Sequence, residues 1–151
     1  MLRVEDPRQL ALALLEVEKK YLLEEGEEYS CAVVVVITPK GRYYEEAEFN
    51  DEIEMDTVYG AIVDRARVKN ATAIITINTA HQQEVTGELD SYWWGKLAVE
   101  DRPRCLHLTI SGPGVEPLSV SLPFAVENNR VIFGTQTGFE PTIVNLLPGW
   151  P

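Results

Sequence analysis

The sequence predicts a single α+β domain: about six strands in a mainly antiparallel, twisted sheet, with two helices packed on one face of it. Two segments carry apolar residues at helical spacing, and six others are rich in β-branched or alternating apolar residues. Most connections between the strands are short, which favours antiparallel pairing. A length of 151 residues with 45% hydrophobic content suits one domain with its own core.

The expected order is helix, strand, strand, helix, strand, an irregular insertion and three more strands. The first helix should begin at Asp6 and end at Gly26, because Asp is a good N-cap and glycine commonly ends a helix. Pro7 suits its first turn. Its apolar residues recur at helical spacing and need a sheet or another helix to cover them: Leu10, Ala11, Leu14, Leu15, Val17, Tyr21 and Leu22.

The next two segments predict a β-hairpin. Residues 29–38 are nearly continuous in valine and isoleucine, which is typical of a strand buried on both faces. The sequence TPKG then has proline second and glycine fourth, as a tight turn prefers. Residues 42–49 return as a more polar partner strand with one face in water.

A second helix follows from Asp51, which forms a capping pattern with Glu54. Apolar residues repeat with helical period after it: Met55, Val58, Tyr59, Ile62, Val63 and Ala66. Basic residues near its end complement the helix dipole: Arg65, Arg67 and Lys69. Residues 71–79 are rich in β-branched side chains and predict the third strand.

Residues 80–103 lose regular periodicity for 24 residues, which is longer than connections within a compact domain usually run. This insertion contains Tyr92, Trp93 and Trp94 in sequence. Exposed rings there can stack on a sugar or a base, or anchor a protein interface. The alternative is that the insertion folds over the sheet and buries them as a satellite core.

The last three strands are expected at 104–111, 118–126 and 130–135. In the middle one, apolar residues alternate with serines, so one face should be buried and the other small and polar. Pro123 cannot donate to a ladder and therefore predicts an edge position or a bulge.

The C-terminal tail, residues 136–151, is apolar but interrupted by proline and glycine. It contains Ile143, Val144, Leu146, Leu147 and Trp150. Because an apolar tail in water would be a liability, we expect it to dock on its own domain or on a second copy of the chain.

The acidic charge lies mostly in the first part of the chain. Up to Asp56 there are 15 acidic and 6 basic residues, net −9, whereas from Thr57 onward there are 9 and 7, net −2. This balance disfavours nucleic acid and anionic membranes as partners. An acidic face can attract a basic partner or a divalent cation, but it more often only keeps a protein soluble. We expect no acid isolated in an apolar environment.

The sequence also predicts a soluble, cytoplasmic protein. The longest strongly apolar run, residues 31–37, is too short to cross a bilayer, and the N-terminus lacks an export signal. Cys31 and Cys105 do not make a disulfide framework and should be reduced core residues.

Three residues define the sharpest chemical possibility. Strand alternation places Cys105 and His107 on one face, and His81 at the end of another strand can approach them if the strands are neighbours. Glu84 or Asp90 would complete a zinc-type ligand set. Cys105 and His107 are also conceivable as a thiol nucleophile and its base, although residues i and i+2 of a strand stand roughly 6 to 7 Å apart. Because no tight ligand pair fixes this geometry, we expect structural roles and no metal.

The function hypothesis is therefore a non-catalytic binding or assembly module without a cofactor. We expect a homo-oligomer, with a dimer favoured, and a protein or small-molecule partner. Its contact surfaces would be the insertion and the tail, through Tyr92, Trp93, Trp94 and Trp150. The alternative is a small metal-dependent or thiol enzyme of the hydrolase class that uses His81, Cys105 and His107.

Overall fold

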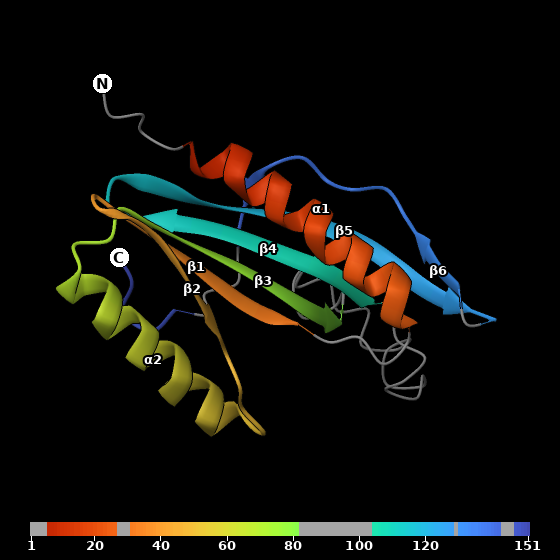
Figure 1. The fold of residues 1–151 in the computed structure, drawn as a ribbon, viewed down its shortest axis with the longest axis horizontal. Helices are drawn as coiled ribbons and strands as arrows, with labels where there is room; N and C mark the ends of the chain where they lie inside the picture. Colours follow the sequence, from red (N-terminus) through yellow and green to blue (C-terminus); the bar gives the residue numbers. More distant parts are fainter. Residues whose placement is uncertain (1–5, 27–30, 82–103, 129, 143–146) are drawn as a thin grey trace.

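The computed structural model of the protein describes residues 6–26, 31–81, 104–128, 130–142 and 147–151 (Figure 1). The α+β class and the expected order of the elements are confirmed. In chain order the elements are α1 (Pro7–Glu25), β1 (Ala32–Thr38), β2 (Gly41–Glu46), α2 (Glu52–Val68), β3 (Ala73–His81), β4 (Arg104–Gly112), β5 (Val115–Glu127), β6 (Arg130–Phe133) and β7 (Glu140–Pro141). None of the helices in these described ranges is long and apolar enough to cross a membrane.

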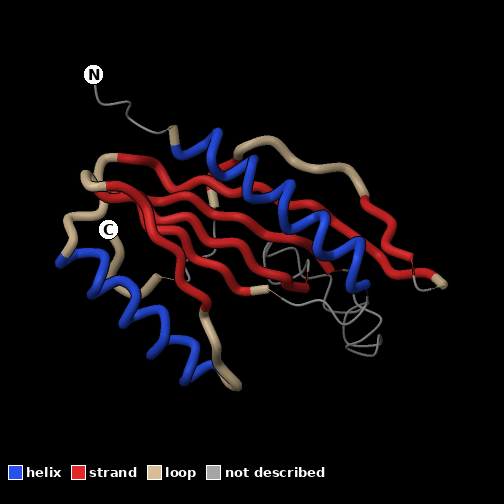
Figure 2. Tube along the Cα trace, in the orientation of Figure 1, coloured by secondary structure: helices blue, strands red, loops and turns tan. Residues whose placement is uncertain are grey.

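The strands form one sheet of seven strands in the order β2-β1-β3-β4-β5-β6, with β7 paired to β5. Each of these pairs is antiparallel, as predicted. Figure 2 shows the twist of the sheet and the helices on either side of it. The short strand β7 belongs to the segment expected to be an irregular tail.

The helices cover opposite faces of the sheet, so the expectation that both pack on one face is wrong (Figure 1). Alternate residues of β1 belong to two separate cores: Val35 packs with α1, whereas Val34 and Val36 pack with α2. The physical reason is that β1 and the start of β3 are apolar on both sides. Each side therefore needs its own cover.

The buried stripe of α1 differs from the predicted one. Its fully shielded residues include Ala11, Leu15 and Leu22, but Val17 and Tyr21 are 45% and 48% exposed. Glu18 occupies the corresponding place on the buried side and is 8% exposed. Residues 11, 15, 18 and 22 share one helical face by spacing, so the packing follows the geometry of the helix and includes a charged residue.

The tail docks on its own chain, which is one of the two expected alternatives. Leu147 and Trp150 are 3% and 8% exposed and join the core between α2 and the sheet. The Arg67 guanidinium also donates a hydrogen bond to the Gly149 carbonyl oxygen. Ile143, Val144 and Leu146 lie outside the described residues.

Pro123 lies at a local edge within β5. β6 pairs with residues 124–127 and β7 with residues 118–119, so no described strand lies beside residues 120–123 on that side. On that side the Gly134 N–H donates a hydrogen bond to the Pro123 carbonyl oxygen. The Thr137 N–H donates to the Ser121 carbonyl oxygen, and the Thr137 hydroxyl accepts from the Ser121 N–H. The missing N–H of Pro123 therefore faces this open side and costs no ladder hydrogen bond.

Both predicted helix starts are confirmed. The Asp6 carboxylate accepts a hydrogen bond from the Arg8 backbone N–H at 3.0 Å. Asp51 accepts one from the Glu54 N–H at 2.8 Å. These side chains satisfy backbone donors that have no partner inside the helix.

Candidate functional site

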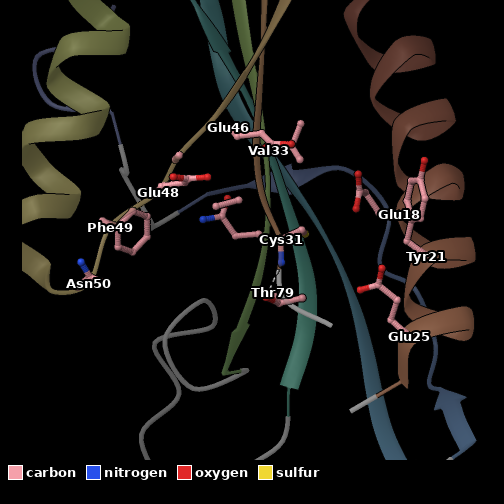
Figure 3. A pocket seen from close by; sticks show the side chains of 13 residues that line it. Glu18, Tyr21, Glu25, Cys31, Val33, Glu46, Glu48, Phe49, Asn50 and Thr79 are labelled. Atoms are coloured by element: carbon pink, nitrogen blue, oxygen red, sulfur yellow. Dashed lines mark hydrogen bonds between the residues drawn. The ribbon is translucent and has the colours of Figure 1, made fainter. Parts of the chain in front are cut away.

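A pocket of about 1020 Å³ lies where the last turns of α1 meet the start of β1 and the chain after β2 (Figure 3). Glu18, Tyr21 and Glu25 reach toward it from α1. Glu48 and Phe49 lie on the opposite side, beside α2. The ends of the central strands lie between these walls and contribute Cys31, Asn78 and Thr79.

The described lining of this pocket is acidic. It includes four glutamates and no lysine, arginine or histidine: Glu18, Glu25, Glu46 and Glu48. The two on α1 and the two near the end of β2 are far apart in sequence, and the fold brings them to one cavity. Carboxylates gathered around a cavity create a negative potential that concentrates cations.

Glu18 is the carboxylate most deeply placed in this lining. Burial raises the pKa of Glu18; a hydrogen bond with the Cys31 side chain opposes this shift and the charge of Glu46 adds to it. We expected no acid isolated in an apolar environment; Glu18 is 8% exposed and desolvated, but Cys31 and Glu46 lie beside it. Helical periodicity did not reveal the burial of Glu18, because the apolar residues of α1 occupy adjoining stripes. Spacing alone does not show which of these stripes packs on the sheet.

Cys31 is half-buried beside Glu18. Burial, together with the charge of Glu18, raises the pKa of the Cys31 thiol to about 12. The thiol lies 3.7 Å from the Ile77 carbonyl oxygen, to which it donates. A thiol in this environment is protonated at neutral pH and is a poor nucleophile. Cys31 and Cys105 are both free thiols, and Cys105 is fully buried as expected.

Asn78, one of the residues that line the pocket, has a side-chain amide of which only one arm is bonded. Its Nδ2 donates to the Tyr59 hydroxyl at 2.9 Å. Its Oδ1 is buried and has no hydrogen-bond partner among the described residues. Buried amide oxygens are normally bonded, so this oxygen is unusual, but it is shielded from solvent and does not open onto the cavity.

A second group of polar side chains lies on the α2 side of the central strands. His107 is 2% exposed, and its Nδ1 lies 3.1 Å from the Ser121 hydroxyl. Its Nε2 is buried without a hydrogen-bond partner in the described part of the chain. Burial lowers the pKa of His107 to about 4, so the imidazole is neutral at pH 7.

The predicted metal and catalytic residues are only partly described. Cys105 and His107 lie on one face of β4, as strand alternation requires. His81 is the last residue of β3 and pairs with Arg104, whereas His107 pairs with Asn78. The His81 side chain, Glu84 and Asp90 lie outside the described residues. Where side chains are described, no group of three or more His, Cys, Asp and Glu residues is arranged to hold a metal ion.

The predicted contact surface has two different outcomes. Tyr92, Trp93 and Trp94 lie outside the described residues, so their exposure stays a prediction. The Trp150 ring is buried in the core of its own chain and does not offer a contact surface there.

The pocket residues were not singled out from the sequence. The available signal was the excess of acid before Asp56, because Glu18 and Glu25 come from one acid-rich stretch and Glu46 and Glu48 from the next. Charge alone cannot distinguish a solvated face from a lined cavity, since that depends on how α1 packs beside β1.

No protein-family model matches the chain, and comparisons with curated proteins and with solved structures also found no match.

Proposed function

We propose that the protein is a binding module that holds a cationic ligand in the acidic pocket between α1, the start of β1 and the chain after β2. One observation carries this proposal: the described lining of a cavity of about 1020 Å³ includes four glutamates and no cationic side chain. The volume falls at the upper end of the range typical of small-molecule sites, roughly 300 to 1000 Å³.

The chemistry of the neighbouring groups supports binding over catalysis. A pKa of about 12 leaves the Cys31 thiol protonated at neutral pH. A pKa of about 4 makes His107 a weak general base, because efficient proton transfer favours a pKa near the working pH. The hydrolase alternative with His81, Cys105 and His107 stays an untested prediction.

The remaining expectations accompany this proposal. We keep assembly into a homo-oligomer through Tyr92, Trp93 and Trp94 as a prediction. Two free cysteines support a reducing compartment such as the cytoplasm. The net charge of −11 supports partners other than nucleic acid or anionic membranes.

Isothermal titration calorimetry with spermidine at low ionic strength tests the proposal. We expect binding to the wild-type protein and an affinity about tenfold lower in the double variant Glu46→Gln, Glu48→Gln, which is a loss of about 1.4 kcal/mol. Added salt should weaken binding because these carboxylates are exposed and easily screened.

The matched control is the double variant Glu116→Gln, Glu127→Gln, which removes the same charge from exposed positions of β5. Its affinity should stay within about twofold of wild type if the pocket is the site. Absence of binding, or an equal loss in both double variants, would contradict a local cation site.

A further inference from the structure

We propose that a second copy of the chain pairs with β2, so that the two sheets continue into one another across a two-fold axis. β2 is the outermost strand at one end of the sheet order, and β1 is its only partner among the described strands (Figure 1). The outer edge of such a strand can pair with a strand of another chain. Pairing at this edge goes beyond ligand binding in the acidic pocket and does not depend on it.

Three residues of β2 turn their backbone N–H and C=O groups away from β1: Arg42, Tyr44 and Glu46. The Ala47 N–H donates to the Ala32 carbonyl oxygen at 2.8 Å, and the register of the two strands continues without a break from there to the turn. In an antiparallel pair the bonded residues alternate along each strand, so residues 45 and 43 bond to β1 and the residues between them do not. The outer edge of β2 is therefore formed by the backbone of these three residues.

The side chains of the same three residues are exposed. Tyr44 lies opposite Val35, which faces the core under α1, and Arg42 and Glu46 share its face by alternation. None of the described residues of β2 belongs to that core, and Tyr44 is 54% exposed. An exposed tyrosine provides a large, rigid side chain for a protein interface.

The sequence of this edge is complementary to itself. When two antiparallel copies of β2 pair with Tyr44 opposite the partner's Tyr44, Arg42 lies opposite the partner's Glu46 at both ends of the pairing. All three outward-facing residues pair in this register, and each opposed pair exchanges two backbone hydrogen bonds. Opposed side chains have Cβ atoms about 4.5–5.5 Å apart, where opposite charges stabilise the pairing. This order of charges favours a second copy over an unrelated strand.

The other face of β2 is compatible with this pairing. Glu45 forms an ion pair with Arg65 of α2, so the two copies of Glu45 do not approach as uncompensated charges. Glu46 also lines the acidic pocket, and its contact with the partner's Arg42 leaves the other glutamates of the lining for a ligand. At the opposite end of the sheet, β6 has four residues and a single charge, so it lacks this complementarity.

Sedimentation velocity over a range of protein concentrations tests the assembly. We expect wild-type protein to dimerise at high concentration. Arg42→Glu and Glu46→Arg should each weaken the dimer at least about tenfold, because each brings like charges together at both ends of the pairing. The matched controls Lys20→Glu and Glu24→Arg make the same charge changes at exposed positions of α1 and should dimerise like wild type.

The double variant Arg42→Glu, Glu46→Arg tests the register. It exchanges the two charges and keeps the net charge of the chain, so its dimer should recover to within about threefold of the wild-type affinity. Recovery is expected only if these two positions face each other across the axis, since otherwise the effects of the single substitutions would accumulate.

Tyr44→Pro tests the backbone pairing. The Tyr44 N–H turns away from β1, so proline there removes no hydrogen bond to β1 but blocks the outer edge. The dimer should be lost while the thermal unfolding transition of the monomer is kept. If the proline variant does not fold, the double variant still decides the outcome.

The possible failures are distinct. Wild-type protein that is monomeric at every concentration would overturn the proposal and leave the cation pocket intact, because sedimentation requires no ligand. A dimer that no β2 variant weakens must use another surface, such as the predicted one at residues 92–94, and would overturn it too. Monomeric single variants without recovery in the folded double variant would contradict the pairing of Arg42 with the partner's Glu46.

Discussion

His107 is a buried histidine whose neutral form the fold requires. It is 2% exposed, and burial lowers its pKa from 6.5 to about 4. Ser121 is a hydrogen-bond partner of one ring nitrogen, and the other nitrogen is buried beside the strand that carries Asn78. Protonation would place an uncompensated charge in the low-dielectric interior, which is why the folded state resists it.

This residue predicts a pH dependence of stability. The unfolded chain takes up a proton at His107 near pH 6.5, whereas the folded chain does so only near pH 4. The stabilisation that the neutral imidazole contributes to the folded state is therefore complete above about pH 6.5 and is lost as the pH falls to about 4. The loss is about 3 kcal/mol at most, because one pKa unit corresponds to about 1.4 kcal/mol. Urea unfolding at pH 7 and 4.5 should show a smaller decrease in His107→Gln than in wild type. Identical decreases would mean that His107 is not buried as described.

At the scale of single elements, α1 contains an unfavourable residue in its buried stripe. Glu18 lies in the buried stripe of α1 between Leu15 and Leu22, where leucine or alanine would pack without the cost of desolvating a charge. Charged groups kept in such positions are commonly found at functional sites. The position of Glu18 in the pocket lining supports this interpretation.

Glu18→Gln should therefore raise the free energy of unfolding at pH 7. A raised pKa means that folding favours the protonated carboxyl, so Glu18 is unfavourable at neutral pH and this cost disappears as the pH falls below its usual value of 4.5. Urea unfolding at pH 7 and pH 4 measures the gain, which should be largest at pH 7. The exposed Glu24→Gln, on the same helix, is the control and should change stability by less than about 0.5 kcal/mol. A lower stability of Glu18→Gln at pH 7 would contradict the argument.

At the scale of the whole molecule, the sheet has a different cover on each face. α1 packs against residues from β1 to β5, whereas α2 shares its side with the docked tail. The ion pair of Arg65 with Glu45 further connects α2 to β2. The basic residues at the end of α2 are thus used within the fold, since Lys69 also lies 4.3 Å from the Tyr43 ring centre.

The tail should be needed for stability, because it completes the core on the α2 side. Trp150→Ala should lower the free energy of unfolding by about 3 kcal/mol, as expected for a large buried ring. Val68→Ala, at a position 84% exposed, should change it by less than about 0.5 kcal/mol. Chemical unfolding measures both values. Deletion of residues 141–151 should likewise expose apolar surface and give insoluble or unfolded protein, and a soluble, fully stable deletion variant would contradict this role.

Local patterns in the sequence were sufficient to predict both helices and six of the seven strands, but not the short strand β7. Helix starts at Asp6 and Asp51, the hairpin turn after Thr38 and the alternation in β5 depend on neighbours a few residues away, so they could be predicted. The excess of acidic residues in the first part of the chain was also evident from the sequence. The sequence did not show that four of these glutamates line one pocket.

Tertiary structure decided what these elements form together. The sequence did not determine which face of the sheet each helix covers, because β1 is apolar on both sides and accepts a helix on either. That choice brings Glu18, Glu46 and Asn78 to one cavity although they are distant in the chain. It also leaves one atom each of Asn78 and His107 buried without a bond among the described residues. Burial and hydrogen bonding depend on contacts between distant segments, which no local pattern of residues encodes.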